Sequence, residues 1–96
     1  SIEGMRILLA EDNELNMEIA EFLLTNAGAE IIKASNGKEA VEAFAKSGVG
    51  EVNVILMDIM MPVMDGLEAT REIRTMNRSD ASAVVIIARG GISIGQ

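Results

Sequence analysis

Three carboxylates stand directly after short apolar runs in this sequence of 96 residues. Glu11 and Asp12 follow the run at 5–10, and Asp58 follows the run at 52–57. If both runs are neighbouring strands of a parallel sheet, their carboxyl ends meet at one edge and the three acids converge. Two like charges about 4 Å apart repel by roughly 4 kcal/mol at an effective dielectric of about 20, so such a cluster calls for a counterion.

The composition limits what that counterion can be. The chain contains no cysteine and no histidine, which excludes thiolate and imidazole ligands as well as disulfides. Oxygen ligands alone suit a hard cation, Mg²⁺ or Mn²⁺, and a metal in an acidic crevice can accept a phosphoryl group. A simpler interpretation stays open at this point, because an aspartate at a strand end is often a turn residue or a helix cap. Glu11 and Asp12 can likewise favour the start of a helix through its dipole.

Charge and hydropathy narrow the class of protein. The formal net charge of −7 argues against direct binding of nucleic acid and of an anionic membrane surface. No apolar run approaches the roughly 20 residues that cross a bilayer, and no signal peptide is visible. Hydrophobic residues make up 49% of the chain, enough for one packed domain. Its core must be aliphatic, because Phe22 and Phe44 are the only aromatic residues.

Short apolar strands alternate with helical patterns along the chain. This order predicts an α/β fold with a parallel sheet covered on both faces. The predicted strands are 5–10, 29–34, 52–57 and 83–88, and the predicted helices are 15–28, 35–48 and 67–76.

Helix ends and apolar stripes support these assignments. Ser35 or Asn36 can cap the second helix, Asp65 with Glu68 fits a capping box for the third, and Gly28 suits the end of the first. The apolar residues at helical spacing are Leu15, Ile19, Phe22 and Leu23 in the first helix, Ala40, Val41 and Phe44 in the second, and Leu67, Ile73 and Met76, expected to face inward, in the third.

Three segments resemble the receiver domain of two-component response regulators: ILLAEDNELNMEIA, ASNGKEAVEAF and ILMDIMMPVMDGLEATREIR. They look most like the receivers of hybrid sensor histidine kinases. The resemblance covers nearly all of 5–88 and implies a CheY-like, flavodoxin-like doubly wound sheet of strand order 2-1-3-4. The family's usual fourth helix, fifth strand and fifth helix would be missing. Residues 1–4 are interpreted as an appended remnant and 89–96 as a glycine-rich tail, in which 92–94 is either a short strand or loose chain.

The resemblance assigns a role to each acid. Asp58 would be the phospho-acceptor, taking the phosphoryl group from a histidine of a partner kinase or phosphotransfer domain. The implied ligands of Mg²⁺ (or Mn²⁺) are Glu11, Asp12, Asp58 and the backbone carbonyl of Met60, and the residues that would shape the following loop are Pro62 and Gly66. A signalling module rather than an enzyme is expected, although receivers assist their own phosphotransfer and a hybrid histidine kinase is one candidate parent. The expected location is the cytoplasm, alone or within a membrane-bound sensor kinase.

The match departs from the family at its end. The family's Ser or Thr position falls on Gly90, and the family's lysine after a fifth strand has no counterpart, since Lys33, Lys38 and Lys46 lie elsewhere. The alternative function is therefore a non-switching pseudo-receiver, or a fragment that self-associates through its fourth strand or a swapped segment. A shortened chain, a degenerate natural receiver and a foreign tail are all compatible with this pattern. A phosphatase of the haloacid dehalogenase type is disfavoured, because Met60 stands where that class needs a second aspartate.

Overall fold

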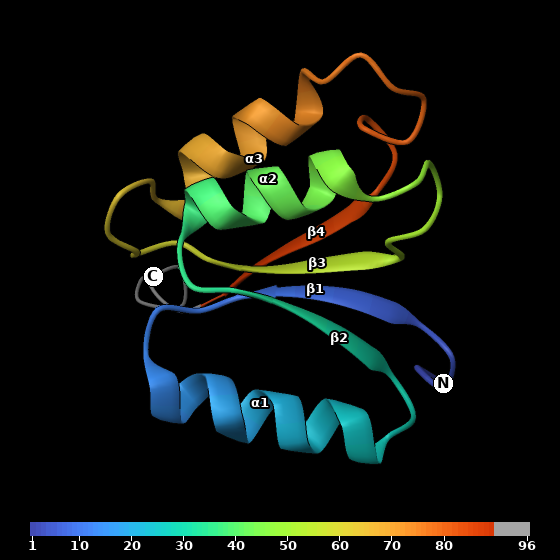
Figure 1. Cartoon of the computed structure of the whole chain (residues 1–96), viewed down its shortest axis with the longest axis vertical. Coiled ribbons are helices and arrows are strands. Elements are labelled where there is room, and N and C mark those ends of the chain that lie inside the picture. The colour runs from blue at the N-terminus through green and yellow to red at the C-terminus, as the bar shows by residue number, and fades with distance from the viewer. Residues whose placement is uncertain (90–96) are drawn as a thin grey trace.

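The computed structural model describes residues 1–89 and shows alternating strands and helices (Figure 1). Each predicted element is present, with ends shifted by a few residues; the fourth strand begins two residues later than expected and includes Arg89. The strand considered for 92–94 lies outside the described residues. The elements are β1 (Arg6–Ala10), α1 (Glu14–Asn26), β2 (Glu30–Ala34), α2 (Gly37–Lys46), β3 (Val54–Asp58), α3 (Gly66–Arg74) and β4 (Val85–Arg89).

The four strands within residues 1–89 form one sheet in the order β2-β1-β3-β4, and all neighbouring pairs are parallel. This confirms the predicted fold class and strand order. The register pairs Ala10 with Met57 and Asp58 with Arg89, so the carboxyl ends of β1, β3 and β4 lie at the same edge. Figure 1 shows α1 on one face of the sheet and α2 and α3 together on the other.

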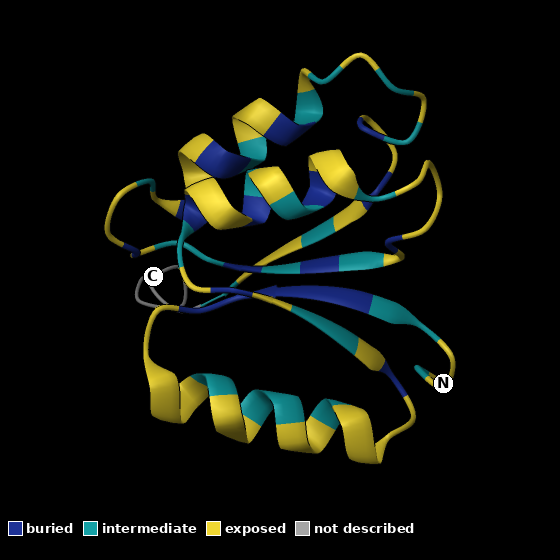
Figure 2. Cartoon of the chain, in the orientation of Figure 1, coloured by how far each residue is buried: buried dark blue, intermediate teal, exposed yellow. Residues whose placement is uncertain are grey.

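The main core lies between the sheet and the α2–α3 pair (Figure 2). Ala40 and Phe44 of α2 are completely buried, as their spacing predicts, while Val41 is half-buried. The buried members of the core are aliphatic apart from Phe44: Leu8, Ala10, Ala34, Ala40, Phe44, Val52, Ile55, Met57, Met61, Ala69, Ile73 and Val84.

The inward face of α3 differs from the predicted one at a single residue. Gly66, Ala69 and Ile73 are buried and follow one another at spacings of three and four residues. Leu67 is exposed, so the prediction that it faces inward is wrong. The reason is geometric: Leu67 stands one residue, or about 100°, from the buried stripe of a helix with 3.6 residues per turn. Met76, beyond the end of α3, is half-buried.

The outer helix α1 is packed much less deeply than the other two. None of its 13 residues is buried, and the half-buried ones include Met17, Ala20 and Leu24. The side chains of the predicted apolar stripe, Leu15, Ile19, Phe22 and Leu23, are each at least 51% exposed. At about 100° per residue, these four residues lie on the side of α1 that faces away from the sheet, and nothing within residues 1–89 covers them.

An asparagine or aspartate side chain caps the N-terminus of each of the three described helices. The Oδ1 atom of Asn36 accepts from the N–H of Glu39 at 2.9 Å, and that of Asp65 accepts from the N–H of Glu68 at 2.8 Å. Asn13 caps α1 in the same way. Gly28, just beyond α1, has a φ of 99°, which glycine adopts without strain, in keeping with the helix end predicted there. None of the described helices is long and apolar enough to cross a membrane.

Candidate functional site

Glu11, Asp12 and Asp58 converge at the carboxyl edge of the sheet. Each contributes a carboxylate oxygen, and the three oxygens lie within 4.8 Å of one another. Glu11 and Asp12 follow β1, and Asp58 ends β3, the neighbouring strand. The convergence is therefore a consequence of the parallel pairing of two strands that both end in acid.

Glu11 is the most enclosed of the three acids. Its side chain is only 7% exposed, and its backbone N–H donates to the carbonyl of Ala34 at 3.0 Å. The N–H of Asn13 donates to Oε2 of Glu11 at 3.0 Å. Because the side chain of Asn13 also caps α1, the first turn of this helix and the acidic cluster are joined through one residue.

Asp58 lies half-buried beside the other two acids. Its burial raises the pKa of its carboxyl above the ordinary value, and the negative charge of Glu11 raises this pKa further, whereas the positive charge of Arg89 opposes the shift. The carboxylate form of Asp58 is thus less favoured in this cluster than in water, and added positive charge would favour it. A set of three carboxylates with no softer ligand fits a hard divalent cation such as Mg²⁺.

The loop after Asp58 returns closely past the end of β3. A Cβ atom on Gly66 would overlap the carbonyl oxygen of Asp58, so only glycine fits there. The N–H of Gly66 donates to the carbonyl of Ile59 at 2.9 Å and closes the loop. Val63, in the same loop, has a φ of 70°, which is rare for a β-branched residue. Pro62 is exposed, and so is the side chain of Met60, two residues beyond Asp58.

A family model described as the response regulator receiver domain matches residues 7–92. This chain belongs to that family. Hybrid signal transduction histidine kinases I and B of Dictyostelium discoideum are 39% and 47% identical to this receiver over 85 and 75 residues. These matches cover 86% and 78% of this chain but only 5% and 4% of the relatives, which are far longer proteins.

Solved receiver structures have the same fold. The receiver domain of sensor histidine kinase PA1611 from Pseudomonas aeruginosa is 35% identical, with a TM-score of 0.85 over 95% of this chain and 70% of that one. That structure is described as having a magnesium ion coordinated in its active-site cleft. The chemotaxis response regulator CheY4 of Vibrio cholerae is 27% identical, with a TM-score of 0.79 over 88% of this chain and 67% of that one.

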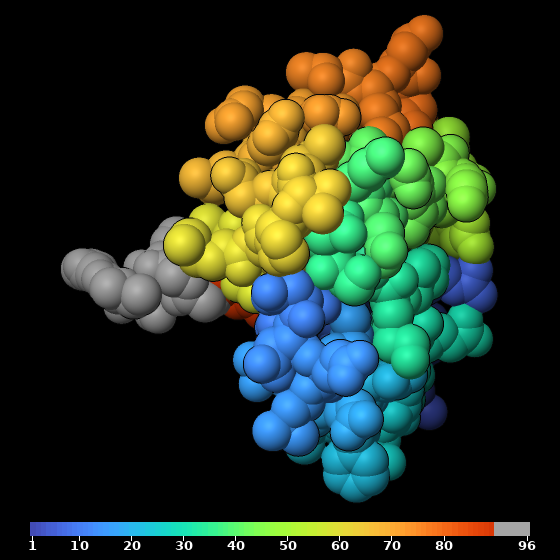
Figure 3. All heavy atoms as spheres, turned by 60° about the vertical axis from the view of Figure 1, so that its left-hand side comes forward, coloured from blue at the N-terminus to red at the C-terminus, as the bar shows by residue number. Residues whose placement is uncertain are grey.

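The acidic cluster of this receiver opens onto two hollows. Figure 3 shows the start of α1, the loop after β3 and the start of α2 side by side on the face that carries the carboxyl ends of the strands. One hollow is an acidic groove lined by Glu11, Asp12, Glu14, Met17, Glu18, Glu21, Lys33, Ala34, Ser35 and Glu39. The other is lined by Glu11, Asn16, Ile19, Ala20, Leu23, Asp58 and Arg89. Asp58 therefore faces the hollow that contains Arg89 and the exposed residues of α1.

Sequence reasoning missed the place of Arg89 in this site. The boundary at 88 put it in the tail, whereas the structure makes it the last residue of β4, paired with Asp58. Its Nη2 atom donates to Oε1 of Glu11 at 3.1 Å. A signal was present, because an arginine that directly follows an apolar strand lies at the same edge as the acids that follow the other strands. The family's hydroxyl position, Gly90, lies outside the described residues.

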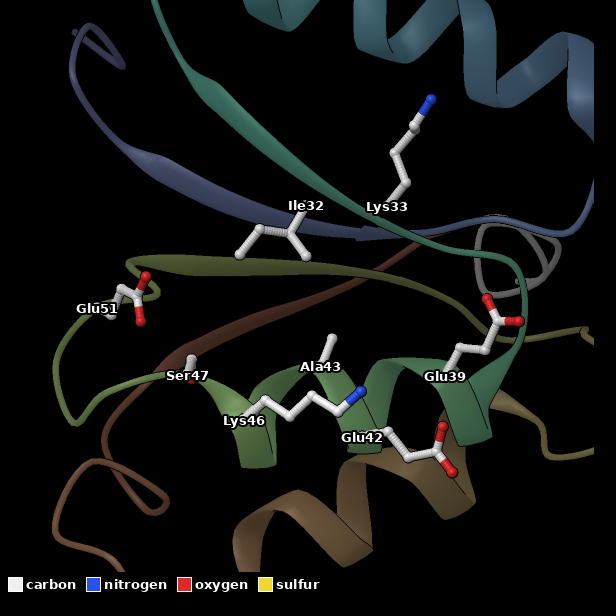
Figure 4. Close-up of a pocket in the computed structure, with 8 residues that line it drawn as sticks. All are labelled: Ile32, Lys33, Glu39, Glu42, Ala43, Lys46, Ser47 and Glu51. Atoms are coloured by element: carbon white, nitrogen blue, oxygen red, sulfur yellow. The ribbon is translucent and has the colours of Figure 1, made fainter.

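A further pocket of this receiver lies beside α2, away from the acid cluster (Figure 4). Figure 4 shows its charged side chains pointing in different directions rather than at a common centre. Lys33, one of them, donates to Glu21 of α1 at 3.3 Å. The pocket is lined by Ile32, Lys33, Glu39, Glu42, Ala43, Lys46, Ser47 and Glu51.

Proposed function

We propose that this receiver accepts a phosphoryl group on Asp58 from a phosphohistidine of a kinase or phosphotransfer domain. The observation that carries the proposal is the convergence of three carboxylate oxygens within 4.8 Å at the end of the acceptor strand. A carboxylate oxygen of Asp58 would form the bond to phosphorus, while the bond from phosphorus to the imidazole nitrogen breaks and its electron pair stays with that nitrogen. Mg²⁺ would neutralise the charge on the phosphoryl oxygens.

Glu11, Asp12 and Asp58 are the proposed ligands of Mg²⁺, with the backbone carbonyl of Met60 as a fourth. The raised pKa of Asp58 supports a cation here, because a neighbouring positive charge favours the ionised form that attacks phosphorus. The magnesium ion described for the PA1611 receiver supports the same assignment by similarity. Pro62 and Gly66 would hold the loop that brings Met60 to the metal. The reaction is proposed to take place in the cytoplasm, where the donor kinase would act.

Phosphorylation of Asp58 would change the charge of the site. Phosphorylation adds about −1.5 to −2 charges at neutral pH, enough to bias a nearby loop between two arrangements. Gly90, however, offers no hydroxyl group for a phosphoryl oxygen, so the Thr-linked switch of the family cannot operate in this chain. The second candidate function is therefore a receiver that accepts phosphate without switching.

We also propose that the domain self-associates. β4 is an edge strand among the described residues, and its outward side chains Val85 and Ile87 are 52% and 48% exposed. An exposed β-branched edge is a template for pairing with another chain. The exposed residues Phe22 and Leu23 of α1 add apolar surface on the same molecule.

The phospho-acceptor assignment can be tested by intact-protein mass spectrometry. The protein is incubated with Mg²⁺ and a small phosphodonor such as acetyl phosphate. We expect a mass gain of one phosphoryl group in the wild type and none in Asp58→Asn or without Mg²⁺. Asp65→Asn is the matched control, because it changes an equivalent side chain that caps α3 and should still gain mass. An equal gain in Asp58→Asn would show that the acceptor is another residue.

A further inference from the structure

Arg89 supplies a positive charge inside the acidic cluster. It ends β4 directly opposite Asp58 on β3. Its guanidinium donates to Glu11 at 3.1 Å, across 78 positions of sequence. The two side chains are 31% and 7% exposed, so this ion pair is largely shielded from water on the Glu11 side. Shielding makes the attraction stronger than that of a pair on the open surface.

Within residues 1–89, the guanidinium of Arg89 makes a hydrogen bond through only one of its three nitrogen atoms. Nη2 bonds Glu11, but the Nε atom is buried and has no hydrogen-bond partner within the described residues. A guanidinium carries five N–H donors in a fixed planar arrangement. Arg89 therefore compensates part of the negative charge, and its displacement from Glu11 would break the one side-chain hydrogen bond that its guanidinium makes within residues 1–89.

A divalent cation at the cluster would compete with this arrangement. It needs the carboxylates of Glu11, Asp12 and Asp58, and Oε1 of Glu11 already accepts from Arg89 while Oε2 accepts from Asn13. The charge of Arg89 also reaches Asp58, since it opposes the effect of Glu11 on the pKa of Asp58. A metal ion and a guanidinium beside the same carboxylates repel each other, so each lowers the affinity of the site for the other.

We propose that Arg89 is an internal competitor of the divalent cation: its guanidinium occupies Glu11 in the metal-free protein and leaves it when the cation binds. The inference rests on the proposed metal site, and it predicts that Arg89 lowers the affinity of this site for the cation. Among the described side chains that line the hollow beside Asp58, Arg89 is the only cationic one.

Calorimetric titration with Mg²⁺ tests the competition. We expect Arg89→Gln to bind Mg²⁺ at least about fivefold more tightly than the wild type, a coupling of ordinary size between two ligands of one site. Arg89→Lys keeps the charge and should stay within about twofold of the wild type. Lys46→Gln is the control for net charge, because Lys46 is exposed in the last turn of α2 and outside the cluster. Unchanged or weaker binding by Arg89→Gln, or an equal gain in Lys46→Gln, would overturn the proposal.

A measurement on the unaltered protein covers the case in which Arg89→Gln fails to fold. The side-chain N–H signal of Arg89, assigned by its absence in Arg89→Lys, should shift on addition of Mg²⁺ along with the amide signal of Asp58. A shift at Asp58 with no change at Arg89 would refute the competition and leave the metal site intact. If Mg²⁺ shifts neither signal and gives no calorimetric binding in any variant, the proposed metal site and this inference both fall.

Discussion

The guanidinium of Arg78 lies 4.2 Å from the centre of the Phe44 ring and donates to the carbonyl oxygen of the same residue at 2.7 Å. It also donates to the carbonyl oxygens of Ser47 and Gly48 at 3.0 and 3.1 Å. The last carbonyls of a helix have no partner within the helix, so Arg78 satisfies the end of α2 from the segment that leads to β4. Asp80 holds the guanidinium in place at 2.6 Å.

Replacement of Arg78 should weaken the fold. Arg78→Ala removes the carbonyl contacts together with the stacking on Phe44, and we expect the melting temperature to fall by roughly 5–10 °C. Arg78→Lys keeps the positive charge but not the planar guanidinium. Its melting temperature should therefore lie between those of the wild type and Arg78→Ala. Thermal unfolding followed by circular dichroism measures both. Arg71→Ala, in the exposed face of α3, is the control. A loss no larger than that of the control would contradict the role of Arg78.

The Arg78–Asp80 pair predicts a pH dependence of stability. The hydrogen bonds from Arg78, and then that from the N–H of Gly50, lower the pKa of Asp80 from 3.8 to about 2. A lowered folded-state pKa stabilises the protein above the unfolded pKa, and the contribution is lost as the pH falls through the folded value. Asp80→Asn should therefore unfold more easily than the wild type above about pH 4, and the difference should shrink between pH 4 and 2. Urea unfolding over this pH range measures the difference in stability between Asp80→Asn and the wild type, and the exposed Glu42→Gln is the control. A difference that does not change with pH would contradict the linkage.

Gly66 is predicted to tolerate no side chain. In Gly66→Ala the new Cβ would overlap the carbonyl oxygen of Asp58, so β3 or α3 would have to move. We expect a loss of about 1–3 kcal/mol in the free energy of unfolding and slower phosphorylation. Gly48→Ala is the matched control, since its Cβ would meet only Glu51 Oε1 at an ordinary 3.6 Å. Equal stability of the two variants, from urea unfolding, would show that the loop can adjust.

The backbone of Val63 is expected to store strain. Its φ of 70° is costly for a β-branched residue, whereas asparagine is several-fold enriched at positive φ. Because the side chain is exposed, Val63→Asn loses little packing and should raise the free energy of unfolding by about 0.5–1 kcal/mol. Val49→Asn serves as the comparison, an exposed valine outside the positive-φ positions. A destabilised Val63→Asn, measured by urea unfolding, would argue against strain at this residue.

Self-association through β4 should respond to charge on the edge strand. Val85→Lys places a lysine on exposed β4 and should shift the population towards monomer in sedimentation equilibrium at high concentration. Val49→Lys makes the same substitution at an exposed valine outside the sheet and should leave the distribution unchanged. A wild type that stays monomeric at all concentrations would exclude association through this edge.

The acid cluster was predictable from sequence because it depends on topology alone. Once two parallel strands both end in acid and lie side by side, Glu11, Asp12 and Asp58 must meet, whatever the details of packing. Helix caps were predictable for a similar reason, since Asn36 and Asp65 bond backbone atoms only three residues away.

Long-range partners were not predictable in this way. The apolar residues of α1 mark a helix, but periodicity does not say which of them another element covers, and Phe22 is exposed. Leu67 is a second example, because it was expected to face inward but is exposed one residue away from the buried stripe of α3. Arg78 and Arg89 contact groups 34 and 78 positions away, and no local pattern identifies the partner of a charged side chain.

Asn13 connects the first turn of α1 to the acidic cluster at the carboxyl edge of the sheet. Its side chain begins α1, and its backbone N–H fixes one oxygen of Glu11. If the first turn of α1 opened, Glu11 would lose that donor and would keep only the hydrogen bond from Arg89 to its side chain. A reporter of helix fraying, such as amide hydrogen exchange at Asn16, would thus also report how well the acidic cluster is organised to receive a ligand.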